Sequence, residues 1–315
     1  NLLFLPLGVL GVGLLARLWG AGTRSAGTAA LALVLIPSVI VQGPSTLVDA
    51  AFTCSCIAAM ALLYLALSNL AGRTVPWRLL VPLGGACGLA LGAKTSGAPW
   101  LAFSLTGLGI AAVIGIANSA NRGCRKQFVV RTVAFLGLCT ALAGAVGGYW
   151  YAVNYIEKGN PLYPLRVTIG GHELLPGAYT RDRFADFTVT DALRPMGNVA
   201  RAVRIWMGKD GRGAGTFAWY LCEGGMSPLW LYVCLPFIGL GLVWACAAWV
   251  SRHRVLWPAP VGTPTAFLVL IAVVGATFLA IPTNWQARHV IWLYGIGLPC
   301  LAVALSVSNR RAARY

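Results

Sequence analysis

Long apolar stretches, separated by short polar connections, dominate this chain. About 20 apolar residues are enough to cross the hydrocarbon core of a bilayer. We identify nine such stretches: 2–19, 26–42, 47–70, 79–93, 98–117, 129–152, 228–250, 264–282 and 288–306. Charged residues make up only 10% of the chain, whereas soluble domains carry about 25%. The sequence therefore predicts an all-α polytopic membrane protein with about nine transmembrane helices.

One long hydrophilic loop, 154–227, interrupts the apolar stretches. It divides the chain into about six membrane helices over 1–153, the loop itself, and about three membrane helices over 228–315. Seven of the eight acidic residues lie in this loop or at its edge. Apolar residues recur at near-helical spacing over 191–207, which predicts a short helix lying along the membrane interface. We therefore expect a long loop that carries short interfacial helices.

Lysine and arginine are concentrated in alternate connections. Thirteen lie in one set, which comprises 17–25, 71–78, 118–131, 251–262 and the tail from 307. Two lie in the other set, which comprises 42–47, 94–97 and 283–288. Cytoplasmic connections are enriched in these residues. We therefore expect the first set and the C-terminus to be cytoplasmic, and the long loop to be extracytoplasmic, in a plasma (inner) membrane. The net charge of +16 is then a membrane feature, and we expect no nucleic-acid partner.

Asp49 stands apart from the other carboxylates, at the predicted start of the third apolar helix. A carboxylate in the first turn of a helix is favoured by the helix dipole. Ionisable groups at membrane depth also face the protein interior or water, where they bind substrates or ions. Both interpretations, a helix-start residue and a substrate-binding residue, stay open at this point.

Two lone cations lie on the predicted outer face, Lys94 and Arg288. Each is either an interfacial anchor or a ligand for a phosphate group, because such groups are bound by lysine and arginine. His289 is a candidate third contact, or only a polar residue at the interface. No His-x-x-x-His or Cys-x-x-Cys motif predicts a metal site, and a divalent metal stays an open alternative.

Four segments together resemble the GT-C class of polytopic membrane glycosyltransferases, whose bacterial members include relatives of the protein mannosyltransferases and aminoarabinose transferases. These segments are Gln42-Gly-Pro-Ser-Thr-Leu-Val-Asp49, Gly88-Leu-Ala-Leu-Gly-Ala-Lys94, Trp150-Tyr-Ala-Val-Asn154 with Gly159-Asn-Pro-Leu-Tyr-Pro164, and Arg288-His289. The third is similar to the family's "RN…GNPxYP" segment, with Val153 in place of the arginine. The fourth is similar to an "RY" helix start, with His289 in place of the tyrosine.

The resemblance implies transfer of a sugar from a polyprenyl-phosphate donor to an acceptor glycan, lipid or protein on the extracytoplasmic side. It adds Asn154, Asn160 and Tyr163 to the candidate substrate-binding residues. It also implies a catalytic carboxylate in a first outer loop, between the family's first two helices. The chain resembles the family from its second helix onward, so we expect that carboxylate upstream of Asn1.

Two other functions stay open. A non-catalytic subunit with the same fold would act as a scaffold in a larger membrane complex, and the substitutions at Val153 and His289 agree with this. A transporter of lipid-linked sugars would show inverted repeats with broken helices, and we find no such pairing in the sequence.

Overall fold

The computed structural model describes residues 2–36, 39–40, 48–117, 122–180, 200–201, 230–251, 264–281 and 287–312. They are mostly helical. The longer helices are α1 (Leu5–Leu18), α2 (Thr23–Val34), α4 (Asp49–Ala71), α5 (Leu80–Ala93), α6 (Gly97–Ala117), α7 (Arg122–Gly147), α8 (Tyr149–Lys158), α11 (Leu235–Ser251), α12 (Pro264–Ala280) and α14 (Tyr294–Ala312). Short elements are η1 (Leu2–Phe4), η2 (Trp77–Leu79), the π-helix η3 (Trp230–Cys234), α13 (Ala287–Val290) and η5 (Ile291–Leu293).

Every predicted apolar stretch overlaps a helix. By length and composition, four helical segments in the described ranges can cross a membrane: Asp49–Ala71, Gly97–Ala117, Arg125–Gly147 and Ile291–Ser308. Four shorter apolar segments accompany them: Leu2–Leu18, Trp77–Ala93, Tyr232–Ala248 and Pro264–Ala280. The chain thus has the character of an all-α membrane protein, and the crossing number of about nine stays a prediction.

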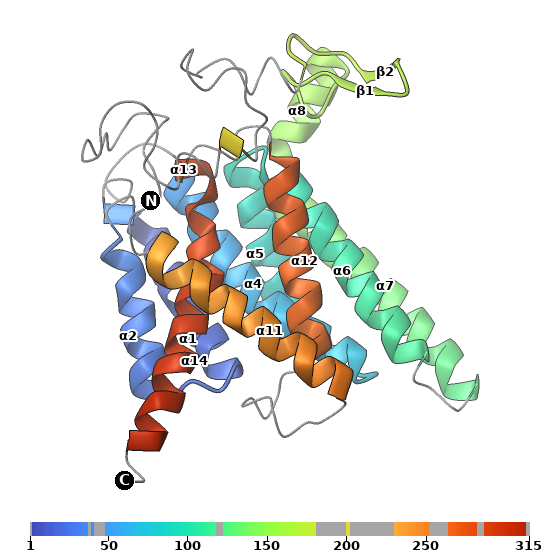
Figure 1. Ribbon diagram of the computed structural model, residues 1–315. Coiled ribbons are helices and arrows are strands. Elements are labelled where there is room, and N and C mark those ends of the chain that lie inside the picture. Colours follow the sequence, from blue (N-terminus) through green and yellow to red (C-terminus); the bar gives the residue numbers. More distant parts are fainter. Residues whose placement is uncertain are drawn as a thin grey trace.

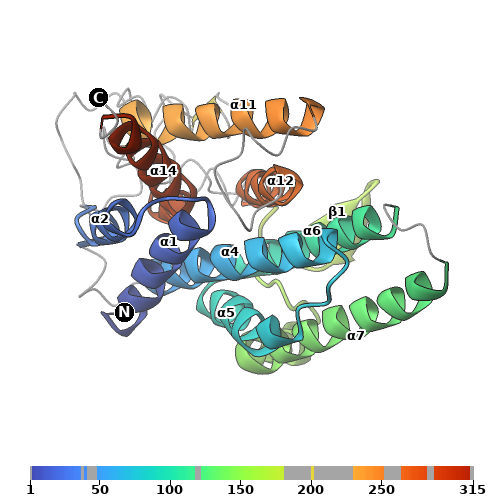
Figure 2. The ribbon, with the colours of Figure 1, turned by 90° about the horizontal axis from the view of Figure 1, so that it is seen from below.

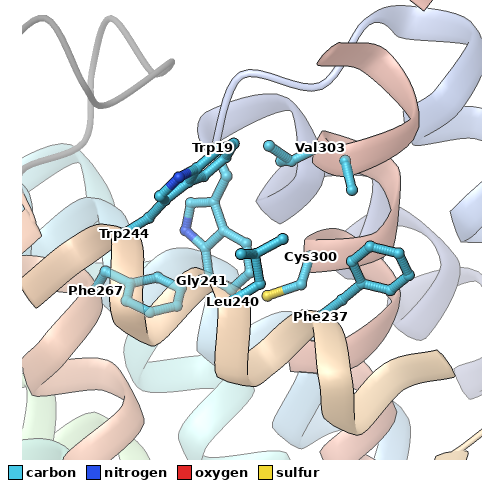
Figure 3. Close-up of a pocket in the computed structure, with 9 residues that line it drawn as sticks. Trp19, Phe237, Leu240, Gly241, Trp244, Phe267, Cys300 and Val303 are labelled. Carbon is cyan, nitrogen blue, oxygen red and sulfur yellow. The ribbon is translucent and has the colours of Figure 1, made fainter. Parts of the chain in front are cut away.

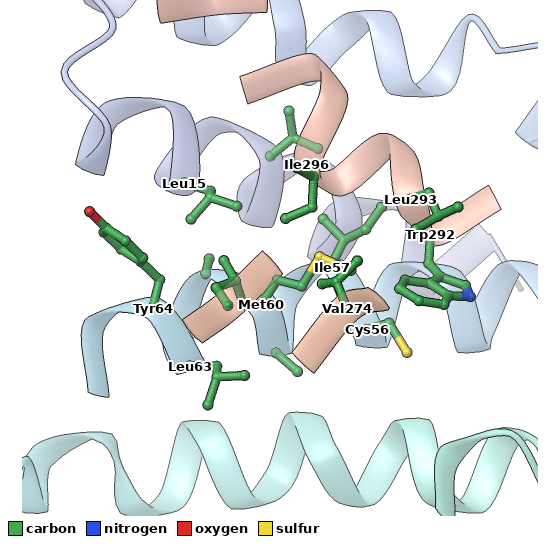
Figure 4. Packing of buried hydrophobic residues seen from close by; sticks show 14 of the residues in the cluster. Leu15, Cys56, Ile57, Met60, Leu63, Tyr64, Val274, Trp292, Leu293 and Ile296 are labelled. Atoms are coloured by element: carbon green, nitrogen blue, oxygen red, sulfur yellow. The ribbon is translucent and has the colours of Figure 1, made fainter. Parts of the chain in front are cut away.

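Helix α4 is the centre of the bundle. It packs against α1, α5, α6 and α12, and its side chains are buried on every face. A helix that is apolar all round is expected in such a position. Figure 4 shows Ile57, Met60 and Tyr64 of α4 beside Leu15 of α1 and Trp292 of η5. The helices from α1 to α7 run alternately up and down (Figure 1).

Glycines bring α5 and α7 into close contact. A Cβ atom on Gly88 would lie 2.7 Å from Cβ of Val146, and one on Gly147 would lie 2.6 Å from the backbone nitrogen of Gly92. Packing through small residues is a common way for membrane helices to associate. Gly144, on the same helix as Gly147, has nothing within 4 Å of such a Cβ. The contact therefore depends on particular glycines.

Large apolar side chains cover the outside of the bundle. Val129, Val133 and Leu138 of α7 are exposed, as a lipid-facing helix requires. Helix α11 runs obliquely across α12 and α14 (Figures 1 and 2), and its Leu240 and Val243 are exposed as well.

The long loop begins differently from the prediction. The predicted span 129–152 ends at Gly147, and α8 follows after Gly148 as a separate helix. A β-hairpin then forms from β1 (Val167–Ile169) and β2 (His172–Leu175). Its turn residues Gly170 and Gly171 have positive φ angles of 57° and 83°, which suit a two-residue hairpin turn. The sequence analysis predicted short helices in this loop and did not predict the hairpin. The predicted helix over 191–207 lies outside the described residues, apart from 200–201.

Candidate functional site

Asp49 and Lys94 form an ion pair. The Lys94 ammonium donates to Oδ1 of Asp49 and joins the start of α4 to the end of α5. The Asp49 side chain is 5% exposed and that of Lys94 is 17% exposed. A mostly buried charge is tolerated when an opposite charge pairs with it. The two candidates predicted separately from the sequence therefore belong to one unit.

The helix termini place both groups. Asp49 is the first residue of α4 and Lys94 directly follows the last residue of α5, so each charge lies at the helix end whose dipole favours it. A tight turn follows Lys94, in which the amide of Gly97 donates to the Lys94 carbonyl oxygen at 2.8 Å. A Cβ atom on Gly97 would collide with the backbone of Ala90 and Leu91, so this turn requires glycine.

Tyr151 of α8 contacts the same turn, and the sequence analysis did not identify it. Its hydroxyl lies 3.4 Å from the carbonyl oxygens of Leu91, Lys94 and Thr95. Burial raises the pKa of Tyr151 to about 12. The hydroxyl therefore keeps its proton at physiological pH and acts as a donor toward these carbonyls. Through this contact, α8, which leads into the long loop, is attached to the turn that carries Lys94.

Arg288 lies at the same end of the bundle. Its helix, α13, packs on α4. Further along, a Cβ atom on Gly295 would lie 2.8 Å from Ile57 and 3.1 Å from Met60, and α4 and α14 run in the same direction (Figure 1). A helix rises about 1.5 Å per residue. Arg288, seven residues before Gly295, is therefore near the level of Asp49, eight residues before Ile57.

A tryptophan pair connects the two cation-bearing turns. Trp100, in the first two turns of α6, and Trp292 of η5 have ring centroids 5.8 Å apart, and both side chains are fully buried. The indole nitrogen of Trp292 donates to the His289 carbonyl oxygen at 2.9 Å. The chain segments that carry Lys94 and Arg288 are thus neighbours. The Arg288 side chain lies outside what the structure describes, and the His289 side chain is half-buried.

The GNPLYP segment forms an ordered turn after α8. Gly159 ends α8 with a φ angle of 66°, a conformation that favours glycine. Asn160 is fully buried; its amide nitrogen donates to the carbonyl oxygens of Leu165 and Pro176, each at 2.7 Å. Its side-chain oxygen accepts from the amide of Leu162 at 2.7 Å. These three bonds give Asn160 a structural role in this turn.

Asn154 and Tyr163 are in the same outer segment. Asn154 is half-buried on α8. Tyr163 is 36% exposed, and the Lys158 ammonium lies 6.0 Å from the centre of its ring. Figure 1 shows α8 and the hairpin standing clear of the bundle, at the end where α5 finishes and α6 begins. Both residues therefore lie at the same end as Lys94, but further out from the bundle.

The site so described can hold an anion but lacks an identified base. Asp49 is the one carboxylate in the described part of the helical bundle itself, and it is paired with Lys94; Glu157 and Glu173 lie further from the bundle, on α8 and β2. Among the described residues, no three His, Cys, Asp or Glu side chains gather as metal ligands do. The arrangement therefore provides one positioned cation. The Lys94 ammonium is held by the Asp49 carboxylate, and Tyr151 contacts the turn that carries it.

Comparisons with known proteins identify no family for this chain. No protein-family model matches the chain, and no curated protein or solved structure matches it either.

Proposed function

We propose that the chain is a membrane glycosyltransferase that takes a sugar from a polyprenyl-phosphate donor at the extracytoplasmic face. The observation that carries this proposal is the convergence of distant segments at one end of the bundle. The ion pair between Asp49 and Lys94, the helix that carries Arg288, and Tyr151 of α8 all lie there. The resemblance of the corresponding sequence segments to the GT-C class supplies the reaction.

The donor phosphate would meet Lys94 and Arg288. In the reaction, an acceptor hydroxyl or amine attacks the anomeric carbon, and the bond from that carbon to the phosphate oxygen breaks. The bonding electrons leave with the phosphate, so negative charge develops there. Cations held in place stabilise that charge more in the transition state than in the ground state. The acceptor proton goes to a carboxylate that acts as the general base, as the resemblance to the GT-C class implies.

Asp49 orients Lys94 in this proposal. An ammonium group has three donors, so an ion pair with Asp49 and a contact with phosphate are compatible. The pair also limits where the ammonium can go, because it connects two helix ends. Preorganisation of this kind lowers the reorganisation needed when charge develops.

The test is transfer from polyprenyl-phosphate mannose and polyprenyl-phosphate aminoarabinose in purified membranes. Lys94→Ala and Arg288→Ala are each expected to slow transfer by about tenfold or more, which corresponds to about 1.4 kcal/mol. Arg78→Ala, at the opposite end of the bundle, is the control and should transfer at the wild-type rate. Wild-type rates in both test variants would remove the two cations from the site.

A scaffold subunit without activity is the second candidate, and one observation favours it. The ion pair and the bonds of Asn160 each have a sufficient structural reason. The two functions predict different results. A scaffold would bind neither donor, and its Lys94 variants would lose stability without any change in sugar transfer, because a scaffold transfers none.

A further inference from the structure

We propose that an anionic phospholipid of the cytoplasmic leaflet binds at the end of the bundle opposite to the ion pair, with one acyl chain in an apolar pocket. This pocket is open on one side, and about 400 Å³ of unfilled space lies within it and at its mouth. Its lining residues come from α11, α12, α14 and the end of α1: Trp19, Phe237, Leu240, Gly241, Trp244, Phe267, Cys300, Val303 and Ala304 (Figure 3). The proposal does not depend on the transferase activity.

The pocket has the chemistry of a lipid chain. All of its lining side chains are apolar or aromatic. Helix α11 crosses α12 and α14 obliquely, and Leu240, which lines the pocket, is 44% exposed on this helix. The pocket is therefore open on the side of α11, where a membrane protein meets lipid. An acyl chain in this space would deprive no lining side chain of a hydrogen-bond partner.

Trp19 forms the wall of the pocket at the end of α1. The residue is 2% exposed, and its ring meets Phe267 edge to face, with centroids 5.0 Å apart. Its indole nitrogen is shut off from the surface, so Trp19 offers only the apolar part of its ring to a ligand. An acyl chain would lie against that ring.

An arginine lies close to the pocket on the side that the charge distribution predicts to be cytoplasmic. Arg17 is in the last turn of α1, and its guanidinium donates to the Ala21 carbonyl oxygen at 2.8 Å, across the turn that contains Trp19. The amide of Gly22 donates to Ser306 Oγ at 2.8 Å, which fixes this turn against α14.

Another arginine lies at the same end of the bundle. Arg24 is in the first turn of α2, which packs against α14. Arg310 and Arg311 belong to the C-terminal segment that the charge distribution predicts to be cytoplasmic. Basic pockets between membrane helices on the cytoplasmic side bind anionic headgroups. The apolar pocket and its basic border together favour phosphatidylglycerol or a related anionic lipid over a zwitterionic one.

The test uses the full chain in phosphatidylcholine nanodiscs that contain phosphatidylglycerol with a photoreactive acyl chain. Peptide mass spectrometry would locate the adducts after illumination. We expect them on the residues that line the pocket, and we expect unlabelled phosphatidylglycerol to suppress them where phosphatidylcholine does not. Adducts spread evenly over exposed residues such as Val129 and Val133 of α7 would contradict the proposal. Suppression by polyprenyl phosphate alone would also contradict it, because the pocket would then hold a donor tail.

Two sets of variants sharpen the result. Ala304→Phe fills the pocket and should remove the adducts, whereas Ala141→Phe, which adds the same ring to an exposed position on α7, should leave them. The double variant Arg24→Gln with Arg310→Gln should lower the preference for phosphatidylglycerol by roughly tenfold or more, because each cation near the surface contributes about 1 kcal/mol. Unchanged labelling in both test variants would overturn the proposal, and the wild-type adducts decide the matter if Ala304→Phe does not fold.

Discussion

Replacing Gly147 with leucine is expected to separate α5 from α7 and to lower the free energy of unfolding by about 3 kcal/mol or more. The reason is that a Cβ atom at this position would lie 2.6 Å from the backbone nitrogen of Gly92, and closer still to the Gly88 carbonyl oxygen. Backbone atoms cannot move aside as a side chain can. The whole of α5 would have to shift, and with it Lys94 at its end.

Thermal unfolding of the purified protein in detergent measures this effect. Gly144→Leu is the matched control, because it adds the same side chain to the same helix where nothing lies within 4 Å. We expect Gly147→Leu to lower the melting temperature strongly or to prevent accumulation of the protein, and Gly144→Leu to behave like the wild type. Equal melting temperatures in the two variants would show that α5 and α7 are not in this contact.

The second large effect is expected at the ion pair. Lys94→Met would leave the Asp49 side chain, which is 5% exposed, without this cation. Breaking a buried pair by removing one partner costs about 3–5 kcal/mol. Because Lys94 is partly exposed, we expect a loss near the lower end, about 3 kcal/mol.

The double variant Asp49→Asn with Lys94→Met separates stability from function. Two neutral side chains have no unpaired charge, so most of the lost stability should return. If the transferase proposal holds, transfer should not return, because the phosphate would still lack its cation. Thermal unfolding and transfer assays on the same three variants measure both quantities. A double variant as unstable as Lys94→Met would mean that the charge pair is not what stabilises this site.

The apolar helices could be predicted from the sequence because long apolar stretches have few alternatives. The boundary between α7 and α8 could not, since no charged residue interrupts the predicted stretch 129–152 between Arg131 and its end. The β-hairpin was missed for a related reason. The Gly170-Gly171 turn lies in a polar loop, where weak alternation of Val167 and Ile169 with polar residues gave little signal.

The candidate site shows what a single sequence leaves out. Asp49 and Lys94 were identified individually, because each is a lone charge near an apolar helix. Their pairing could not be predicted, because 45 residues separate them and nothing local indicates which helix ends meet. Tyr151 was missed because an aromatic residue at a helix end also fits a membrane-interface belt. Its contact with the Lys94 turn depends on the direction in which α8 leaves α7.

The proposed function requires that the turns around Lys94 and Arg288 form one phosphate-binding site. A cryo-electron microscopy map of the protein saturated with polyprenyl phosphate tests this most directly. We predict phosphate density within about 4 Å of the Lys94 nitrogen, the range of an ion pair, and in contact with the Arg288 side chain. Phosphate density elsewhere on the protein, or an unoccupied outer end at saturating lipid, would contradict the claim.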